Sequence, residues 1–353
     1  MDEYNAIGLM SGTSLDGVDI AACEFMLSGA KWSFKIHYGQ TYPYSPEWKS
    51  KLAGLASTDA LTFSHTNVEY GHLLGSLTRI FLEETGFKAD FIASHGHTIF
   101  HQPENGLTVQ IGSGSAIAAE TGLPVICDFR SVDVALGGQG APLVPVGDRL
   151  LFSEFDACLN LGGFANISME LNGQRIAFDI CPVNIVLNLL AARLGLDFDK
   201  DGLIARSGDV NSELLEQLDN LDYYNQKWPK SLGREWLETE YLPVINRYPG
   251  PIENILSTVC EHTARQVNQS APMGDDSIVL MTGGGVHNHF LLERIRELSN
   301  RNWIVPQNEL IDYKEALVFA FLGVLRWRNE PNVLRSVTGS RINHAGGAIY
   351  HPV

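Results

Sequence analysis

The sequence has few positive charges for its length, and this shortage narrows the classes of partner that it can bind. Its 353 residues include 25 lysines and arginines against 41 aspartates and glutamates, which gives a formal net charge of −16. Surfaces that bind nucleic acid need stripes of Lys and Arg to neutralise phosphates, so we expect no nucleic-acid partner. The charge balance still allows a small anion that is held locally by backbone N–H groups.

The sequence also lacks the signals of export and membrane insertion. The first residues, MDEYN, have neither the basic nor the apolar region of a signal peptide. The longest strongly apolar stretch, 316–325, is too short to span a bilayer. The five cysteines are scattered and form no CxxC pair, which is typical of free thiols in a reducing compartment. We therefore expect a cytoplasmic protein with no membrane partner.

Two common phosphate-binding fingerprints are absent. No glycine is followed by lysine, which excludes a P-loop, and Ile117 stands where a dinucleotide fingerprint that begins at Gly112 needs its third glycine. Three other glycine turns, 12–17, 162–163 and 283–285, each follow an apolar, strand-like run. Glycine allows positive φ and close backbone approach, and successive N–H groups form a concave anion site. Each turn alone also fits an ordinary connection, but together they predict phosphate binding.

Strand-like and helix-like segments alternate along the chain, and the pattern starts twice. Residues 7–25 read as a hairpin followed by a strand at 32–42, and residues 155–171 with 175–179 repeat this order. Such alternation predicts an α/β fold with largely parallel sheets in two domains. We expect an N-terminal domain at 1–140, a connecting helix at 141–152, a C-terminal domain at 153–328, and a tail at 329–353 that packs back near the N-terminal domain.

Further elements follow from hydrophobic periodicity. In the first half we expect helices at 60–84 and 115–121 and strands at 90–94 and 123–127. In the second half, a helix at 183–194 precedes a long polar loop, and an apolar helix at 315–328 belongs to the core. The other expected elements are helices at 254–269 and 289–300 and a strand at 277–281. The tail from 336, rich in Gly, Ser and His, is expected at the surface.

Several strings resemble the family of 1,6-anhydro-N-acetylmuramic acid kinases, within the superfamily of actin, sugar kinases and the heat-shock chaperone ATPases. The most specific lie in GLMSGTSLDGVD (8–19) and CDFRSVDVALGGQGAPLVP (127–145). The others follow in order over nearly the whole chain: SHGHTIFHQP (94–103), QIG (110–112), LNLGGFANIS (159–168), FDICPVN (178–184), TGGGVHN (282–288), EALVFAFLG (315–323) and SVTG (336–339). The resemblance implies two actin-like (ribonuclease H-like) domains that flank an ATP cleft. Members of the family also tend to form homodimers, although the sequence shows no interface.

The resemblance implies a reaction and a set of site residues. Water would open the anhydro ring and O6 would be phosphorylated from ATP, giving N-acetylmuramic acid 6-phosphate, with Asp179 as the general base. Asp16 and Asp19 would hold Mg²⁺. The other expected ATP-binding residues are Gly12, Thr13, Ser14, Leu15, Gly17, Val18, Gly162, Gly163, Gly283, Gly284, Gly285 and Asn288. The expected sugar-binding residues are His95, His97, Asp128, Arg130 and Gln139.

The sequence departs from the family pattern around Asp179. DICPVN stands where the family has a string close to DTGPGN, so that Ile180, Cys181 and Val183 replace a threonine and two glycines. In addition, a histidine at 97 replaces a glutamine, and an asparagine at 188 replaces an aspartate. These changes leave an alternative open: a divergent paralogue that binds nucleotide or sugar with weak or no turnover, or a kinase for another anhydrosugar.

Two other chemistries remain open from the residues alone. His95, His97 and His101 have zinc-like spacing, and with Asp128 they would suit a metal hydrolase. The same histidines would otherwise be hydrogen-bonded groups of a core or binding site. Cys181 lies beside Asp179 and is a candidate nucleophile, but no motif supplies a histidine partner. Without the resemblance, Asp179 itself also fits a helix N-cap or a loop carboxylate.

Overall fold

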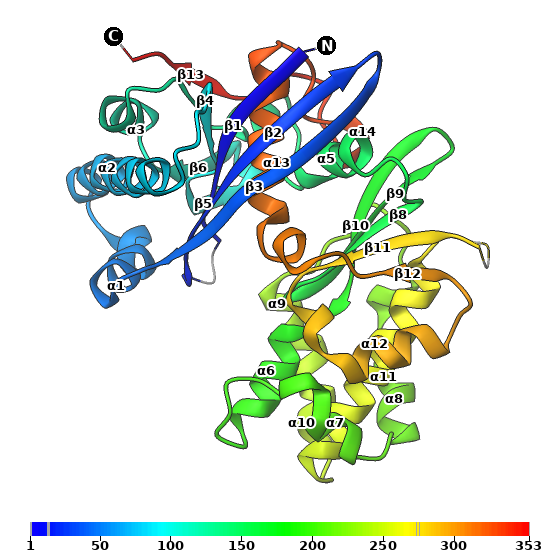
Figure 1. The fold of residues 1–353 in the computed structure, drawn as a ribbon. Coiled ribbons are helices and arrows are strands. Elements are labelled where there is room, and N and C mark those ends of the chain that lie inside the picture. The colour runs from blue at the N-terminus through cyan, green and yellow to red at the C-terminus, as the bar shows by residue number, and fades with distance from the viewer. Residues whose placement is uncertain (1, 13–14, 273, 275, 353) are drawn as a thin grey trace. The chain divides into compact units, whose positions relative to one another are not determined.

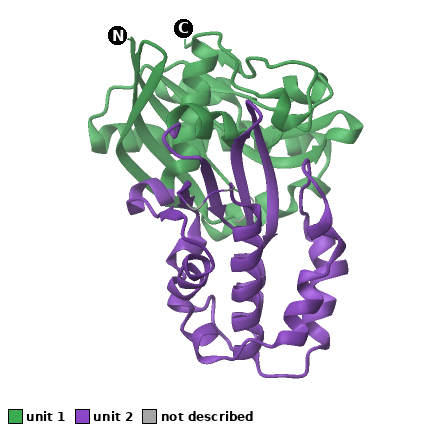
Figure 2. Ribbon diagram, turned by 90° about the vertical axis from the view of Figure 1, so that its right-hand side faces the viewer, with its two compact units in different colours: residues 1–151, 313–353 green, residues 152–312 purple. Residues whose placement is uncertain are grey.

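The computed structural model describes residues 2–12, 15–272, 274 and 276–352. The described residues form two compact units (Figure 2). Unit 1 comprises residues 1–151 and 313–353, and unit 2 comprises residues 152–312. This grouping places residues 313–328 in unit 1, whereas the expected domains placed them with the C-terminal part. The domain boundaries themselves stay a prediction.

Unit 1 is built on a sheet with the strand order β13-β7-β4-β1-β2-β3 (Figure 1). The chain first makes an antiparallel meander, in which β2 pairs with both β1 and β3, and then adds β4 and β7 parallel to β1. The C-terminal strand β13 closes the edge antiparallel to β7. The strands are β1 (Asp2–Met10), β2 (Gly17–Ser28), β3 (Lys31–Pro43), β4 (Phe91–Ser94), β7 (Val125–Cys127) and β13 (Ala348–Tyr350).

Helices cover both faces of this sheet. Ile7 and Leu9 of β1 belong to a buried cluster with Tyr70 and Leu74 of α2 (Ala60–Thr85) and with residues of α3 (Gly114–Thr121). Side chains alternate between the faces of a strand, so Gly8 points the other way, where it meets α13 (Asn308–Trp327). The apolar stretch expected in the core is therefore one layer of unit 1.

Gly8 allows β1 and α13 to approach closely. A Cβ atom built on Gly8 would overlap the backbone carbonyl of Ala316, and backbone cannot move aside as a flexible side chain can. We expect Gly8→Ala to lower the free energy of unfolding by about 3 kcal/mol, as overpacking of a core does. Urea denaturation would measure it. Gly54→Ala is the control, because a Cβ on Gly54 meets open space; equal stability of the two variants would contradict the close packing.

Unit 2 repeats the strand order of unit 1. Its sheet runs β10-β9-β8-β11-β12, again an antiparallel meander of the first strands followed by parallel ones. The strands are β8 (Ala157–Leu161), β9 (Phe164–Leu171), β10 (Gln174–Pro182), β11 (Ile278–Thr282) and β12 (Asn302–Ile304). The predicted restart of the architecture is thus confirmed, and with it the α/β fold class of two ribonuclease H-like units.

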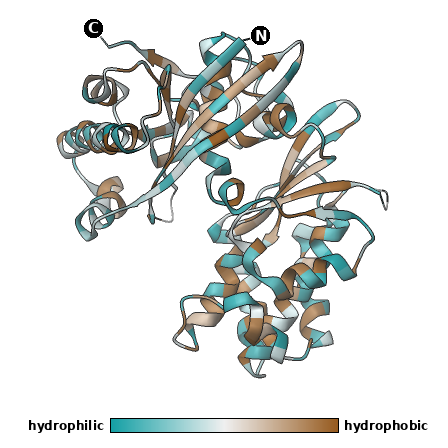
Figure 3. Ribbon diagram, viewed as in Figure 1, coloured by the Kyte–Doolittle hydropathy of each residue, from teal (hydrophilic) through white to brown (hydrophobic). Residues whose placement is uncertain are grey.

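One core holds the sheet and helices of unit 2 together. Alternate residues of β8 (Ala157, Leu159 and Leu161) pack with side chains of α6 (Asn184–Ala192) and α11 (Ile252–Ser270). Along α11 hydrophobic residues such as Ile255, Leu256 and Val259 are mixed with hydrophilic ones, as in an amphipathic helix (Figure 3). The other helices of this unit are α7 (Leu203–Ser207), α8 (Ser212–Asp219), α9 (Arg234–Trp236), α10 (Leu242–Arg247) and α12 (His289–Glu297).

Three sequence expectations were wrong or incomplete. The expected polar loop after α6 contains α7, α8 and α10, because Leu214, Leu218 and Ile245 reach the core. The hairpin of β5 (His97–Gln102) and β6 (Leu107–Ile111) was not expected. The tail is not merely surface, since β13 joins the sheet and Thr338 is buried. The remaining helices of unit 1 are α1 (Pro46–Gly54), α4 (Ser131–Ala135), α5 (Val144–Leu151) and α14 (Arg335–Thr338).

None of the helices in the described part of the chain is both long and apolar enough to cross a membrane.

Candidate active site

The turn between β1 and β2 in unit 1 is the first expected phosphate site. The Leu15 N–H donates to the Gly12 carbonyl at 3.3 Å, and Leu15 has a positive φ of 60°. The Asp19 carboxylate accepts from the Thr41 hydroxyl at 2.6 Å, while Asp16 is exposed. Packing alone explains the glycine at position 17, because a Cβ there would overlap the Tyr42 carbonyl. The structure places Val18 in the core. Thr13 and Ser14 lie outside the described residues.

The expected glycine turns of unit 2 also follow strands. Gly162 and Gly163 connect β8 to β9, and their carbonyls accept the N–H groups of Asn184 and Val183 at the start of α6. Gly283 has a φ of 84°, and a Cβ there would lie 2.5 Å from the Asn160 side chain. Gly163 and Gly284, in contrast, are exposed, and a Cβ on either would meet no atom closer than 3.6 Å. These two positions leave the backbone open to a ligand.

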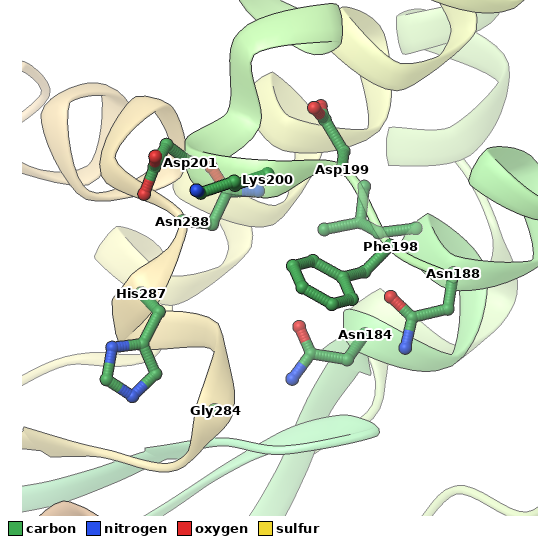
Figure 4. A pocket seen from close by; sticks show the side chains of 10 residues that line it. Asn184, Asn188, Phe198, Asp199, Lys200, Asp201, Gly284, His287 and Asn288 are labelled. Carbon is green, nitrogen blue, oxygen red and sulfur yellow. The ribbon is translucent and has the colours of Figure 1, made fainter. Parts of the chain in front are cut away.

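A pocket of about 470 Å³ lies in unit 2 beside the second of these turns. It contains Gly284 and Asn288 from the predicted nucleotide site, and Figure 4 shows the Phe198 ring projecting toward the space beside Asn184. Asn288 also caps α12, since its side chain accepts the Leu291 N–H at 3.0 Å. The remaining lining residues are Leu187, Asn188, Asp199, Lys200, Asp201 and His287. Gly285 of the same turn is buried.

Asp179 lies near the end of β10, where the register shifts between Asp179 and Cys181. Its carboxylate accepts the Leu232 N–H at 2.8 Å. Burial raises the pKa of the Asp179 carboxyl, and the hydrogen bond from Leu232 lowers it in part. A β-bulge re-aims a side chain, and a carboxylate with a raised pKa on a strand suits a general base. The expectation of a helix N-cap does not describe this position.

Two of the residues expected to bind the sugar, His95 and Arg130 of unit 1, are in direct contact. The Arg130 guanidinium donates to His95 Nε2 at 2.8 Å from Nη2 and at 3.2 Å from Nε, and Nη1 donates to the Gly140 carbonyl. Burial, followed by the charge of Arg130, lowers the pKa of His95 to about 3. The neutral ring therefore accepts at Nε2 and donates from Nδ1 to the Gly96 carbonyl, 2.9 Å away.

The other expected sugar-site residues have separate partners. His97 Nδ1 lies 2.9 Å from the Ser11 hydroxyl, and Ser11 in turn lies 2.6 Å from the Tyr44 hydroxyl. Asp128 is exposed and accepts from the Ser131 hydroxyl, and Gln139 is also exposed. His97 thus adjoins the turn at Gly12 through Ser11, and it is also an electrostatic neighbour of His95.

The zinc hypothesis is not supported. His101 Nδ1 lies 3.1 Å from the Thr108 hydroxyl, and Arg130 is among its electrostatic neighbours. Within the residues that the structure describes, no three or more His, Cys, Asp or Glu side chains are grouped so that they could hold a metal ion.

The comparison with known proteins decides the family. Residues 4–352 match the family model described as anhydro-N-acetylmuramic acid kinase. The chain belongs to this family. Among the relatives of that name, those of Vibrio cholerae and Aliivibrio fischeri are each 35% identical to it, over 98% and 99% of both chains. The relative from Sulfurovum sp. is 34% identical over 99% of this chain and 100% of its own. Membership confirms the predicted resemblance and phosphotransferase class, and supports the use of ATP.

The departures from the anhydro-N-acetylmuramic acid kinase pattern are accommodated in the core of unit 2. Ile180, Cys181 and Val183 are all buried, and all three belong to the apolar core cluster of unit 2. Burial raises the pKa of the Cys181 thiol to about 12. A thiol that stays protonated at neutral pH is a poor nucleophile, so the structure does not support that alternative for Cys181.

Some candidate residues escaped the sequence analysis. Glu315 was assigned with its helix to the core, but Arg130 and Asp19 are among its electrostatic neighbours in unit 1. The carboxylate of Glu315 at the start of the apolar string EALVFAFLG could have marked it as a candidate site residue. Phe198 and Lys200 line the pocket of unit 2, but they come from a segment without periodicity, so no pattern in the sequence pointed to them.

Proposed function

We propose that the chain opens 1,6-anhydro-N-acetylmuramic acid with water and phosphorylates O6, using ATP and Mg²⁺, with Asp179 as the general base. Membership of the family over nearly the whole chain supports the substrate and the reaction. The observation that carries the role of Asp179 is its place at the bulge of β10, where a backbone N–H holds its carboxylate and burial raises its pKa.

The reaction needs one proton acceptor on the protein. Asp179 takes a proton from water as the water oxygen bonds to the anomeric carbon, and the bond from that carbon to O6 breaks. The electron pair of this bond goes to O6, which becomes the phosphoryl acceptor. ATP, when bound, supplies the γ-phosphoryl group. The transfer depends on positioning and neutralisation of charge more than on covalent chemistry with the protein, which fits a thiol at Cys181 that stays protonated.

The nucleotide residues of unit 2 fit the predicted ligand. The pocket beside Gly284 and Asn288 receives the adenosine, and the exposed backbone at Gly163 and Gly284 contacts phosphates. A pocket of about 470 Å³ lies within the usual range for small-molecule sites. In unit 1, the turn from Gly12 to Asp19 contributes backbone and carboxylate groups, and His95, His97, Asp128, Arg130 and Gln139 contribute to sugar binding.

Asp16 and Asp19 are proposed to hold Mg²⁺, directly or through water. Carboxylate oxygens are the hard ligands that Mg²⁺ prefers, and Asp16 is exposed beside the turn. We expect Asp16→Asn to lower turnover about tenfold at limiting Mg²⁺, with partial recovery as Mg²⁺ is raised, because the metal site loses a charge. A titration of rate against Mg²⁺ would measure it. Glu47→Gln, which removes an exposed carboxylate of unit 1 that has no assigned role, is the control for the change of charge; an unchanged Mg²⁺ requirement in Asp16→Asn would contradict the assignment.

The decisive assay is release of ADP from Mg²⁺-ATP with and without the anhydrosugar, together with mass analysis of the sugar product. Release that needs the sugar and a product heavier by water and a phosphoryl group would support the proposal. Nucleotide binding without such release would favour the alternative, a paralogue with weak or no turnover or one for another anhydrosugar. No observation in the structure favours that alternative.

The setting of the protein is proposed on the same basis. We propose that the enzyme acts in the cytoplasm, with neither nucleic acid nor membrane as a partner. The homodimer that the family resemblance implies is likewise a proposal, which light scattering at several protein concentrations would test.

A further inference from the structure

A segment far from Asp179 in the sequence lies against it in unit 2. We propose that this segment, residues 222–232, holds Asp179 in place and that Tyr223 is a positioning residue for it. The inference rests on the proposed role of Asp179 as the general base. We call residues 222–232 the strap.

The strap contacts Asp179 at its backbone and its side chain. The Tyr223 hydroxyl donates to the Asp179 carbonyl at 2.6 Å, and the Asp179 N–H donates to the Lys230 carbonyl at 3.3 Å. The Leu232 N–H donates to the Asp179 carboxylate at 2.8 Å. A group that is held on both sides of its Cα and at its carboxylate has little freedom to rotate, as a catalytic base requires.

The position of β10 explains why these contacts matter. β10 is at the edge of its sheet, so backbone groups on its outer side have no neighbouring strand to pair with. The bulge at Ile180 further interrupts the pairing with β9. A buried carbonyl or N–H without a partner is costly, and the strap supplies both partners at Asp179. The strap thus takes the place of a further strand where the ladder is irregular.

Tyr223 is itself fixed from several sides. Its side chain is buried, and its ring centroid lies 5.3 Å from that of Trp236. The Lys230 ammonium lies 4.5 Å from the centroid of the Tyr223 ring and also donates to the Tyr223 carbonyl at 3.3 Å. The two ends of the strap are therefore tied to each other as well as to Asp179, which makes the Tyr223 hydroxyl a fixed donor.

The adjacent tyrosine offers a matched control. The Tyr224 hydroxyl pairs with His262 Nε2 at 3.0 Å, and His262 pairs with Asp219. Phenylalanine at 224 would remove a hydroxyl hydrogen bond from the same strap, at the next residue, without removing any contact to Asp179. A general loosening of unit 2 should therefore affect both variants, whereas a positioning role belongs to Tyr223 alone.

The experiment compares Tyr223→Phe and Tyr224→Phe with the wild-type chain in the sugar-dependent release of ADP. We expect Tyr223→Phe to lower kcat about tenfold, the order of one lost hydrogen bond, with KM for both substrates within about twofold of wild type. Tyr224→Phe should keep the kcat of the wild type. Equal kcat values in the two variants, or a change confined to KM, would overturn the inference.

A second measurement does not depend on catalysis. Hydrogen–deuterium exchange should be faster in Tyr223→Phe than in Tyr224→Phe for peptides that cover 179–183 and 228–233. Without the Tyr223 hydroxyl the strap is less firmly bound to β10, so the hydrogen bonds of the Leu232 and Asp179 amides should open more often. Unchanged exchange in Tyr223→Phe would overturn the inference even if the wild-type chain showed no turnover. Absence of turnover in the wild type alone, with the expected exchange, would contradict the proposed function and leave the hold on Asp179 supported.

Discussion

Asp179→Asn is expected to lower sugar-dependent ADP release about 1000-fold while ATP binding stays at the wild-type level. A positioned general base contributes about 10²- to 10⁴-fold to a rate, and an amide cannot take the proton from water. The amide still accepts the Leu232 N–H, so the bulge and the strap should keep their geometry. A coupled assay for ADP would measure the rate, and isothermal titration would measure the binding of ATP.

The control for this variant is Asp222→Asn. Asp222 is an exposed carboxylate on the strap, and its loss changes the net charge equally without touching Asp179. Its kcat should equal that of the wild type. Retention of more than about a tenth of the wild-type rate in Asp179→Asn would remove Asp179 from the role of the base, since so small a loss is below the range for general base catalysis.

The pH dependence of the wild-type enzyme gives the same assignment another test. Burial raises the pKa of the Asp179 carboxyl above its ordinary value of 3.8, and only the deprotonated form acts as a base. Activity should therefore fall on the acidic side at a pH higher than an ordinary aspartate would give. The acid limb should be absent from the residual activity of Asp179→Asn.

Gly284→Val is expected to weaken ATP binding about 100-fold with little loss of stability. A Cβ on Gly284 meets no atom closer than 3.6 Å, so the fold accepts the side chain, and Gly284 lines the pocket. The added methyl groups would occupy space that the nucleotide needs, and the misfit costs a few kcal/mol, as overpacking does elsewhere. Titration with a fluorescent ATP analogue would measure the affinity, and thermal denaturation would measure the stability.

Gly54→Val is the matched control for Gly284→Val. Gly54 lies at the end of α1 in unit 1, where a Cβ also meets open space and no positive φ is required. This variant should bind the analogue as the wild type does. If Gly284→Val also kept wild-type affinity, the pocket of unit 2 would not be the nucleotide site, and the glycine turn would have only a structural role.

The sequence predicted best those helices and strands that form because of residues close to one another in the chain. The hairpins at 7–25 and 155–171 follow from apolar runs on either side of a glycine turn, and α2 follows from its periodicity and from the αL glycine at position 86 that ends it. The motifs also single out Gly163 and Gly284, whose backbone is exposed at turns because glycine has no side chain. The roles of these glycines and of Asn288 in nucleotide binding stay predictions.

The elements that the sequence did not predict depend on distant contacts. The strap has no periodic pattern, and its hydrogen bonds to Asp179 join residues that are 44 and 53 positions apart. The small helices α7, α8 and α10 exist because their apolar residues reach a core formed by other segments. Local propensity is a weak prior that tertiary packing overrides, and these segments show that override.

The sequence by itself determined the fold class and the repeat of one strand order in two units, and it resembled the family that the comparisons then showed. The choice of Asp179 as the base stays a prediction. Only the tertiary structure decided how the Asp179 carboxylate is held, that Ile180, Cys181 and Val183 fill a core, and that the described residues group no three possible metal ligands around the expected zinc-binding histidines. The reason is physical: hydrophobic period and turn chemistry act between neighbours in the chain, whereas burial, pKa and hydrogen-bond partners arise from residues that only folding brings together.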